Sequence, residues 1–153
     1  MNADRPGDSI QDRIGPGTRI QIGPPSKPDP RLALALAETL VHLPGVLEAH
    51  LPQCFVFGST SRSALVLVVV VADSCLFSGA LKDDLCAELS RLLPVDKHLD
   101  VWYFDTSHCL LEGVRSANCQ ILGRSASGEL VALRPWSLWR RVRRKLFHVF
   151  AGL

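Results

Sequence analysis

Two segments of the chain carry apolar residues at every third or fourth position, which predicts two amphipathic helices. The first stripe consists of Leu32, Leu36, Leu40 and Leu43, and the second of Leu81, Leu85, Leu89 and Leu92. Asp29 followed by Pro30 is typical of a helix start, because the carboxylate caps free amides and proline suits the first turn. Ser78 precedes the second stripe and Pro94 follows it. We therefore expect each helix to be bounded by its own sequence signals.

Shorter apolar runs predict β-strands around these helices. They cover residues 18–22, 46–56, 64–72, 99–104 and 118–123. The run 64–72 reads ALVLVVVVA. It is far shorter than the roughly twenty residues of a membrane-spanning helix, and its valines favour a buried strand. Pro52 interrupts the second run, which predicts an edge position or a bulge there.

The order of these elements predicts an α+β fold. Strand, helix, strand, strand, helix and strand follow one another, and a short third helix is expected after Thr106. This order matches a split βαβ arrangement. We expect a mostly antiparallel sheet of four or five strands with the two main helices on one face.

Composition changes along the chain and predicts four regions. Residues 1–16 are polar and rich in Gly and Pro without periodicity, which predicts a flexible leader. Residues 17–124 hold the predicted α+β domain. Residues 125–134 begin with SASG and are expected to form a linker. Residues 135–153 follow as a separate C-terminal segment.

The C-terminal segment has the pattern of a basic amphipathic helix. Residues 136–153 read WSLWRRVRRKLFHVFAGL, with apolar and basic positions on opposite sides of a helical projection. Such a helix suits an anionic membrane surface or the groove of an acidic partner. The expected contact residues are Trp136, Trp139, Arg140, Arg141, Val142, Arg144, Lys145, Leu146, Val149 and Phe150.

The charges of the chain are unevenly placed. Six of its 17 basic residues and none of its 15 acidic residues follow Leu133, although the net charge is only +2. A basic tail on an acidic body is attracted to anionic surfaces. Two hypotheses stay open: the tail binds a membrane surface or protein partner, or its apolar side docks on its own domain or on a second copy. Nucleic acid is the least favoured partner, because the body is acidic and the aromatic residues do not alternate with the arginines.

Several motifs resemble the C-terminal domain of the enhanced-serine-sensitivity (SseB) proteins. A Gly-Thr pair opens the first strand, Pro44, Val46 and Ala49 match a P-x-V-x-x-A strand entry, and LDVWYFD at 99–105 is similar to a later strand. The resemblance spans roughly residues 17–123. It implies a small bacterial cytoplasmic accessory protein and brings no catalytic residues with it. Together with the basic tail, it predicts a non-enzymatic interaction protein at the inner membrane surface.

Gly58 and Ser59 support an alternative of another class. Their position after an apolar strand is similar to the Gly-Ser turn of small nucleotidyltransferases, in which the turn helps to hold a nucleotide phosphate. Those enzymes also need carboxylates that bind Mg²⁺. The following run contains no acidic residue before Asp73. The alternative is therefore a degenerate nucleotide-binding domain rather than an active transferase.

The remaining reactive residues form no recognisable catalytic or metal-binding motif. The five cysteines are odd in number and none has C-x-x-C spacing. The five histidines include no H-x-x-x-H pair. We therefore expect reduced, buried thiols in an intracellular chain, and we predict neither a cofactor nor a metal site.

Overall fold

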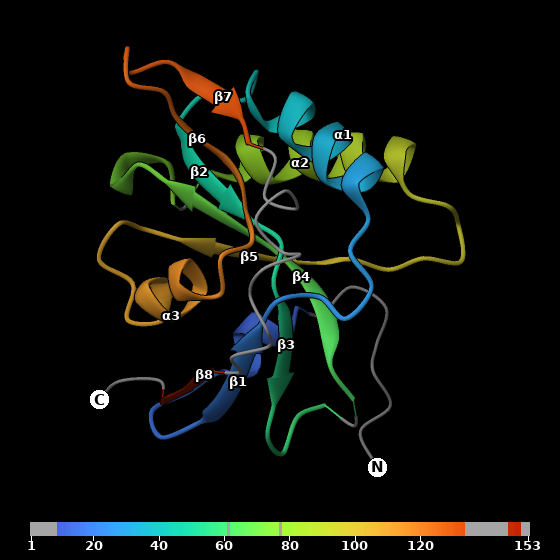
Figure 1. Ribbon diagram of the computed structural model, residues 1–153, viewed down its shortest axis with the longest axis vertical. Helices are drawn as coiled ribbons and strands as arrows, with labels where there is room; N and C mark the ends of the chain where they lie inside the picture. The colour runs from blue at the N-terminus through green and yellow to red at the C-terminus, as the bar shows by residue number, and fades with distance from the viewer. Residues whose placement is uncertain (1–8, 61, 77, 134–146, 151–153) are drawn as a thin grey trace.

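The computed structural model describes residues 9–60, 62–76, 78–133 and 147–150. Within these ranges the helices are α1 (Pro30–Leu40), α2 (Gly79–Leu92) and α3 (Leu111–Ser116), with short 3-10 turns η1 (Ile10–Arg13) and η2 (Asp73–Cys75). The strands are β1 (Arg19–Gly23), β2 (Val46–His50), β3 (Gln53–Val56), β4 (Ala64–Val71), β5 (Asp100–Phe104), β6 (Gln120–Arg124), β7 (Leu130–Ala132) and β8 (Phe147–Phe150). The α+β class and the mostly antiparallel sheet are thus confirmed (Figure 1).

The two main helices begin where their capping residues predict. The Asp29 carboxylate accepts a hydrogen bond from the Leu32 amide, and Pro30 occupies the first turn of α1. The Ser78 hydroxyl caps α2 by accepting from the Leu81 amide. Both side chains satisfy amides that the helix itself leaves unpaired. No helix in the described ranges is long and apolar enough to cross a bilayer.

Strand β4 is the centre of the sheet. It pairs antiparallel with β2 and β3 and parallel with β5. The strands follow the order β7-β6-β2-β4-β3-β1-β8. Strands β2 and β3 pair with successive parts of one edge of β4, and β5 pairs with its opposite edge. Pro52 separates β2 from β3, so that each of these strands pairs with a different outer neighbour, β6 or β1. The predicted interruption at Pro52 is confirmed.

Alternating residues of β4 supply two separate cores. Leu67, Val69 and Val71 pack with the buried faces of α1 and α2. Val66, Val68 and Val70 face the other way and pack with α3 and with Trp102 and Phe104 of β5. Figure 1 shows α1 and α2 together on one side of the sheet and α3 away from them. The prediction of two main helices on one face is therefore confirmed, and the small third helix fills the opposite face.

Two details of the predicted topology are wrong. The described sheet contains eight strands rather than four or five. The arrangement is not split either, because β4 and β5 are direct parallel neighbours, in register from Val66↔Asp100 to Val70↔Phe104. Helix α2 makes the crossover that a parallel pair requires. The extra strands are short and have mixed burial, so that their sequences carry little periodicity.

The predicted leader and linker are also wrong for their described residues. In the leader, η1 packs against β5, and Gln11 exchanges two hydrogen bonds with the backbone of Tyr103. In the linker, Ser125 to Gly128 form the turn of the β6–β7 hairpin, closed by a 2.7 Å bond from the Ser125 amide to the Glu129 carbonyl. Gly128 has φ +86°, a conformation that glycine adopts without strain. Polar composition signalled a turn here rather than a free connection.

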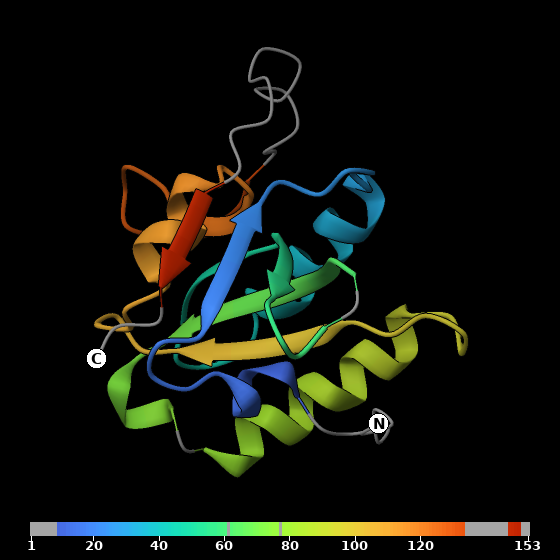
Figure 2. The same cartoon turned by 90° about the horizontal axis from the view of Figure 1, so that it is seen from below.

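The C-terminal helix is wrong at residues 147–150, which form β8. This strand pairs antiparallel with β1, from Arg19↔Phe150 to Ile22↔Phe147. Figure 2 shows the two strands side by side. The unpaired backbone groups on the edge of β1 attract another strand, and the sequence FHVF is rich in residues that favour strands. The other residues of the predicted helix lie outside the described ranges.

Candidate functional site

The predicted partner-contact residues divide into two groups. Val149 and Phe150 lie in β8, opposite Ile20 and Arg19 of β1. The other eight lie outside the described part of the chain; they are Trp136, Trp139, Arg140, Arg141, Val142, Arg144, Lys145 and Leu146.

The basic residues of the C-terminal segment lie in the sequence between two strands of the sheet. Strand β7 ends at Ala132 and pairs with β6, while β8 begins at Phe147 and pairs with β1. These two strands stand at opposite ends of the strand order. All six basic residues after Leu133 fall between them in the sequence. The basic segment, residues 134–146, is thus preceded and followed in the sequence by a strand of the sheet.

Gly58 and Ser59 lie in the turn between β3 and β4. Gly58 has φ +84°, which explains why glycine occupies this position. The amides of Ser59 and Thr60 both donate to the Val56 carbonyl, at 3.1 and 3.0 Å. The Thr60 hydroxyl in turn accepts from the Val56 amide at 3.1 Å. These amides are engaged within the turn, so the geometry matches a closed hairpin turn rather than a cradle for phosphate.

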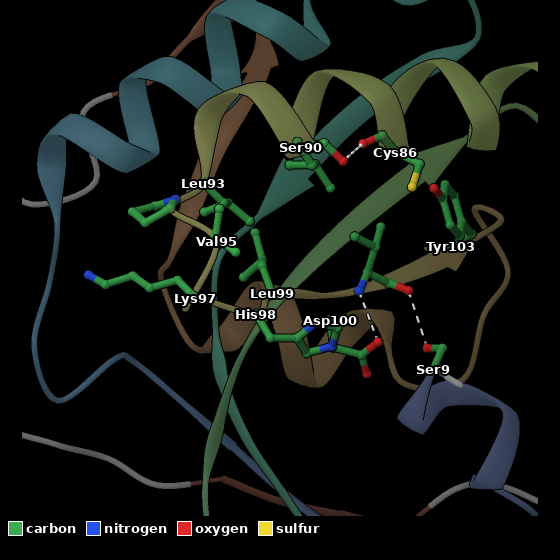
Figure 3. Close-up of a pocket in the computed structure, with 13 residues that line it drawn as sticks. Ser9, Cys86, Ser90, Leu93, Val95, Lys97, His98, Leu99, Asp100 and Tyr103 are labelled. Carbon is green, nitrogen blue, oxygen red and sulfur yellow. Dashed lines mark hydrogen bonds between the residues drawn. The ribbon is translucent and has the colours of Figure 1, made fainter. Parts of the chain in front are cut away.

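A cleft of about 490 Å³ lies between α2 and β5, and sequence reasoning did not identify it. Figure 3 shows Cys86 beside Tyr103 at one end of the cleft, and Val95 with Lys97 at the other. Its apolar lining comes from Leu89, Leu93, Pro94, Val95, Leu99 and Val101, and its polar lining from Ser9, Ser90, Lys97, His98, Asp100 and Tyr103. A concave site of this size with mixed lining suits the binding of a small or extended ligand.

Asp100 holds the floor of the cleft together. Its side chain is buried, and its Oδ2 accepts hydrogen bonds from the Trp102 indole at 2.8 Å and the Ile10 amide at 3.0 Å. Its Oδ1 accepts from the Val101 amide at 3.1 Å. Three donors compensate for the burial of this polar group. The carboxylate is therefore occupied in joining β5 to η1.

Tyr103 and Cys86 form one polar end of the cleft. Burial, assisted by the neighbouring Cys86, raises the pKa of the Tyr103 phenol to about 12. The phenol therefore stays protonated even in mildly alkaline solution, and its O–H can donate a hydrogen bond. The ammonium group of Lys82 lies 5.1 Å from the centre of the Tyr103 ring, within the range of a cation–π contact. This end of the cleft is suited to binding polar groups.

A second cavity, of about 360 Å³, lies at the C-terminal end of β5, and Tyr103 lines both this cavity and the cleft. His108 borders it and stacks on Phe104 with ring centres 3.7 Å apart. Burial lowers the pKa of His108, although Asp105 opposes this effect. The His108 Nδ1 accepts from the Leu110 amide at 3.2 Å, which leaves the proton of the neutral ring on Nε2. His108 thus acts as a neutral, packed side chain.

Glu48 and His50 form a hydrogen-bonded pair on the α3 side of β2. His50 is almost fully buried, and its Nε2 lies 2.9 Å from Glu48 Oε1. The hydrogen bond from His50 and a further one from Arg115 outweigh the effect of burial and hold the pKa of Glu48 at about 2. Residues two apart on a strand share a face, so the sequence Glu-x-His was a usable signal for this pair.

The thiols differ in exposure. Cys54 and Cys119 are buried, whereas Cys86 and Cys109 are exposed, and all five cysteines are free. Burial raises the pKa of the Cys54 thiol and, to about 12, that of Cys119. The expectation of buried thiols therefore holds for these two residues and is wrong for the exposed pair. Among the described residues, no three His, Cys, Asp or Glu side chains converge to hold a metal ion.

Neither protein-family models nor curated proteins nor solved structures include a significant match to this chain.

Proposed function

We propose that this chain is a non-enzymatic accessory or interaction protein of the SseB-like type. It attaches to an anionic membrane surface, or to an acidic protein partner, through the basic segment between β7 and β8. In a bacterial cell, this places it in the cytoplasm, peripheral to the inner membrane. The contact is carried by Trp136, Trp139, Arg140, Arg141, Val142, Arg144, Lys145 and Leu146.

The connection of this segment to two strands carries the proposal. The strands on either side of the basic residues in the sequence, β7 and β8, both belong to the sheet. Holding a charged segment at both ends reduces the entropy that it loses on binding. Each cation close to an anionic leaflet contributes on the order of 1 kcal/mol, and tryptophans favour the headgroup region.

The polar groups of the cleft support a binding role rather than catalysis. The Asp100 carboxylate already accepts three hydrogen bonds that hold the fold together. The high pKa of Tyr103, about 12, keeps its phenol protonated. A general base needs a pKa near the working pH and access to its substrate. The Tyr103 phenol does not meet the first condition, and the buried Asp100 carboxylate does not meet the second.

Sedimentation with lipid vesicles tests whether the protein attaches to a membrane surface. The full chain is mixed with vesicles rich in anionic lipid and, separately, with neutral vesicles. We expect it to sediment with the anionic vesicles and to be released by salt, since the attraction is electrostatic. Equal sedimentation with both kinds, or with neither, contradicts membrane attachment. Deleting residues 135–153 is a poor control, because it also removes β8 and uncovers the edge of β1.

The nucleotide-binding alternative has a separate test. If the turn at Gly58 and Ser59 held a nucleotide, Mg²⁺ with nucleoside triphosphates would raise the melting temperature of the protein, and Ser59→Ala would remove that increase. Our proposal expects the same melting temperature with and without nucleotide in both forms.

A further inference from the structure

The outer edge of β5 is covered by side chains instead of by a strand. In a parallel pair, alternate residues of a strand direct their backbone groups toward the partner strand. In β5, Val101 and Tyr103 direct theirs away from β4 toward η1. Figure 2 shows η1 lying beside this edge of the sheet. An uncovered edge of this kind is a template for another strand.

The N–H and C=O groups of Val101 and Tyr103 are the four outward backbone groups, and three side chains satisfy them all. Gln11 does most of this, because its amide nitrogen donates to the Tyr103 carbonyl and its amide oxygen accepts from the Tyr103 N–H, both at 2.8 Å. Asp100 accepts from the Val101 N–H at 3.1 Å, and the Ser9 hydroxyl is 3.4 Å from the Val101 carbonyl. The Gln11 amide thus copies the two bonds that a paired residue of an antiparallel strand would make.

The same edge is complementary to itself. An antiparallel pair of two β5 strands, with its two-fold axis at Trp102, sets Val101 of one copy opposite Tyr103 of the other. Each such pair exchanges two N–H···O bonds, so that all eight outward groups of the two copies are satisfied. The charges at the two ends of the edge are also complementary, because Lys97 precedes β5 and Asp105 follows it. The two-fold axis brings these opposite charges to the same end of the pair.

We propose that η1 guards β5, and that β5 is the docking edge for a second copy of this chain when Gln11 leaves it. In the guarded state the edge is closed and the chain does not dimerise through β5. Displacement of η1 opens the edge and lets two copies join into one continuous sheet. The proposal is independent of the basic segment and of its partner.

The test replaces Gln11 by alanine in the full chain and measures the mass in solution over a range of concentrations. Dimerisation of the wild type must break two Gln11–Tyr103 bonds in each copy, whereas the variant has none to break. We expect Gln11→Ala to tighten self-association by at least about tenfold. Asp12→Ala, the neighbouring change in η1, is the matched control and should associate as the wild type does.

A second variant identifies the edge that is used. Val101→Pro removes an N–H group that points away from β4 and donates to Asp100. Proline is tolerated at such a position on an edge strand. Gln11→Ala with Val101→Pro should return to the wild-type mass. Hydrogen exchange gives a further readout: in Gln11→Ala the Tyr103 amide should be protected at high protein concentration and exposed on dilution.

Three results would overturn the proposal. The first is a monomeric Gln11→Ala whose Tyr103 amide exchanges rapidly at every concentration, since the edge is then open but unused. The second is self-association that persists in the Gln11→Ala, Val101→Pro double variant, including aggregation of a poorly folded protein. The third is equal association of Asp12→Ala and Gln11→Ala.

Discussion

Arg115 binds Glu48 with two parallel hydrogen bonds, from Nε to Oε1 and from Nη2 to Oε2, each 2.9 Å long. This contact joins α3 to β2 across 67 positions of the sequence. Glu48 also lies 2.9 Å from the buried His50 Nε2, so that one carboxylate serves two partners. Its removal leaves a buried imidazole nitrogen and a guanidinium group without their acceptor, which is costly.

We predict that Glu48→Gln lowers the free energy of unfolding by about 1–3 kcal/mol at pH 7. The pKa of Glu48 falls from 4.5 to about 2 on folding. The contribution of the carboxylate is therefore complete above pH 4.5 and is lost as the pH falls toward 2. Urea unfolding at a series of pH values should show the wild type and the variant converging in acid.

Glu88→Gln is the matched control for this prediction. Glu88 forms an exposed pair with Arg91 on α2, and such pairs contribute at most about 1 kcal/mol. A loss in Glu88→Gln equal to that in Glu48→Gln, or an unchanged difference between Glu48→Gln and wild type at pH 2, would contradict the assignment.

His108 should make the stability of the protein depend on pH for another reason, which is burial rather than hydrogen bonding. Burial lowers its pKa from 6.5, so the unfolded chain takes up a proton more readily than the folded protein does. Stability should consequently fall as the pH decreases below 6.5. His108→Phe keeps a ring against Phe104 and should flatten this slope, whatever its effect at pH 7. His42→Gln, at an exposed position, should leave the slope unchanged. Urea unfolding between pH 7 and 5 measures both.

The thiols should react in two classes. Cys86 and Cys109 are exposed, whereas burial raises the pKa of both Cys54 and Cys119 and keeps them from reagents. A thiol reagent at pH 8 should modify Cys86 and Cys109 rapidly and the buried pair only after unfolding. Mass spectrometry of the digested protein locates the label. Rapid labelling of Cys54 in the folded protein would show that its core is not packed as described.

The helices and the central strands could be predicted from the sequence because their signals are local. Asp29 and Ser78 mark the starts of α1 and α2 through caps that reach only a few residues. The valine run of β4 is buried on both sides, and such a strand appears as a continuous apolar segment. Burial and capping at these positions leave their imprint in short windows of sequence.

The elements that were missed depend on distant partners. Residues 147–150 have a local helical pattern, yet the free edge of β1 pairs them as a strand. The segment 9–14 has no apolar periodicity, and its position is set by Gln11 and by the Asp100 carboxylate, about ninety residues later. Non-local hydrogen bonds of this kind override local preference and leave little trace in composition.

The candidate cleft was missed for a different reason. Its lining comes almost entirely from the continuous stretch 86–103, which runs from α2 through a loop into β5, and only Ser9 is distant in sequence. This stretch carries no recognisable binding motif. The nucleotide-like signal at Gly58, in contrast, proved to be a conformational requirement of a turn with positive φ. Gly-Ser pairs occur in many tight turns, so their spacing alone does not distinguish binding from chain reversal.

Attachment through the basic segment is tested most directly by two variants with equal charge change on anionic vesicles. One replaces Arg140, Arg141, Arg144 and Lys145 by serine; the other replaces the exposed Lys27, Arg31, Arg91 and Lys97. Our account predicts that the first variant loses at least about a hundredfold in vesicle affinity and that the second stays close to wild type. Equal losses in the two variants, or wild-type binding by the first, would contradict it.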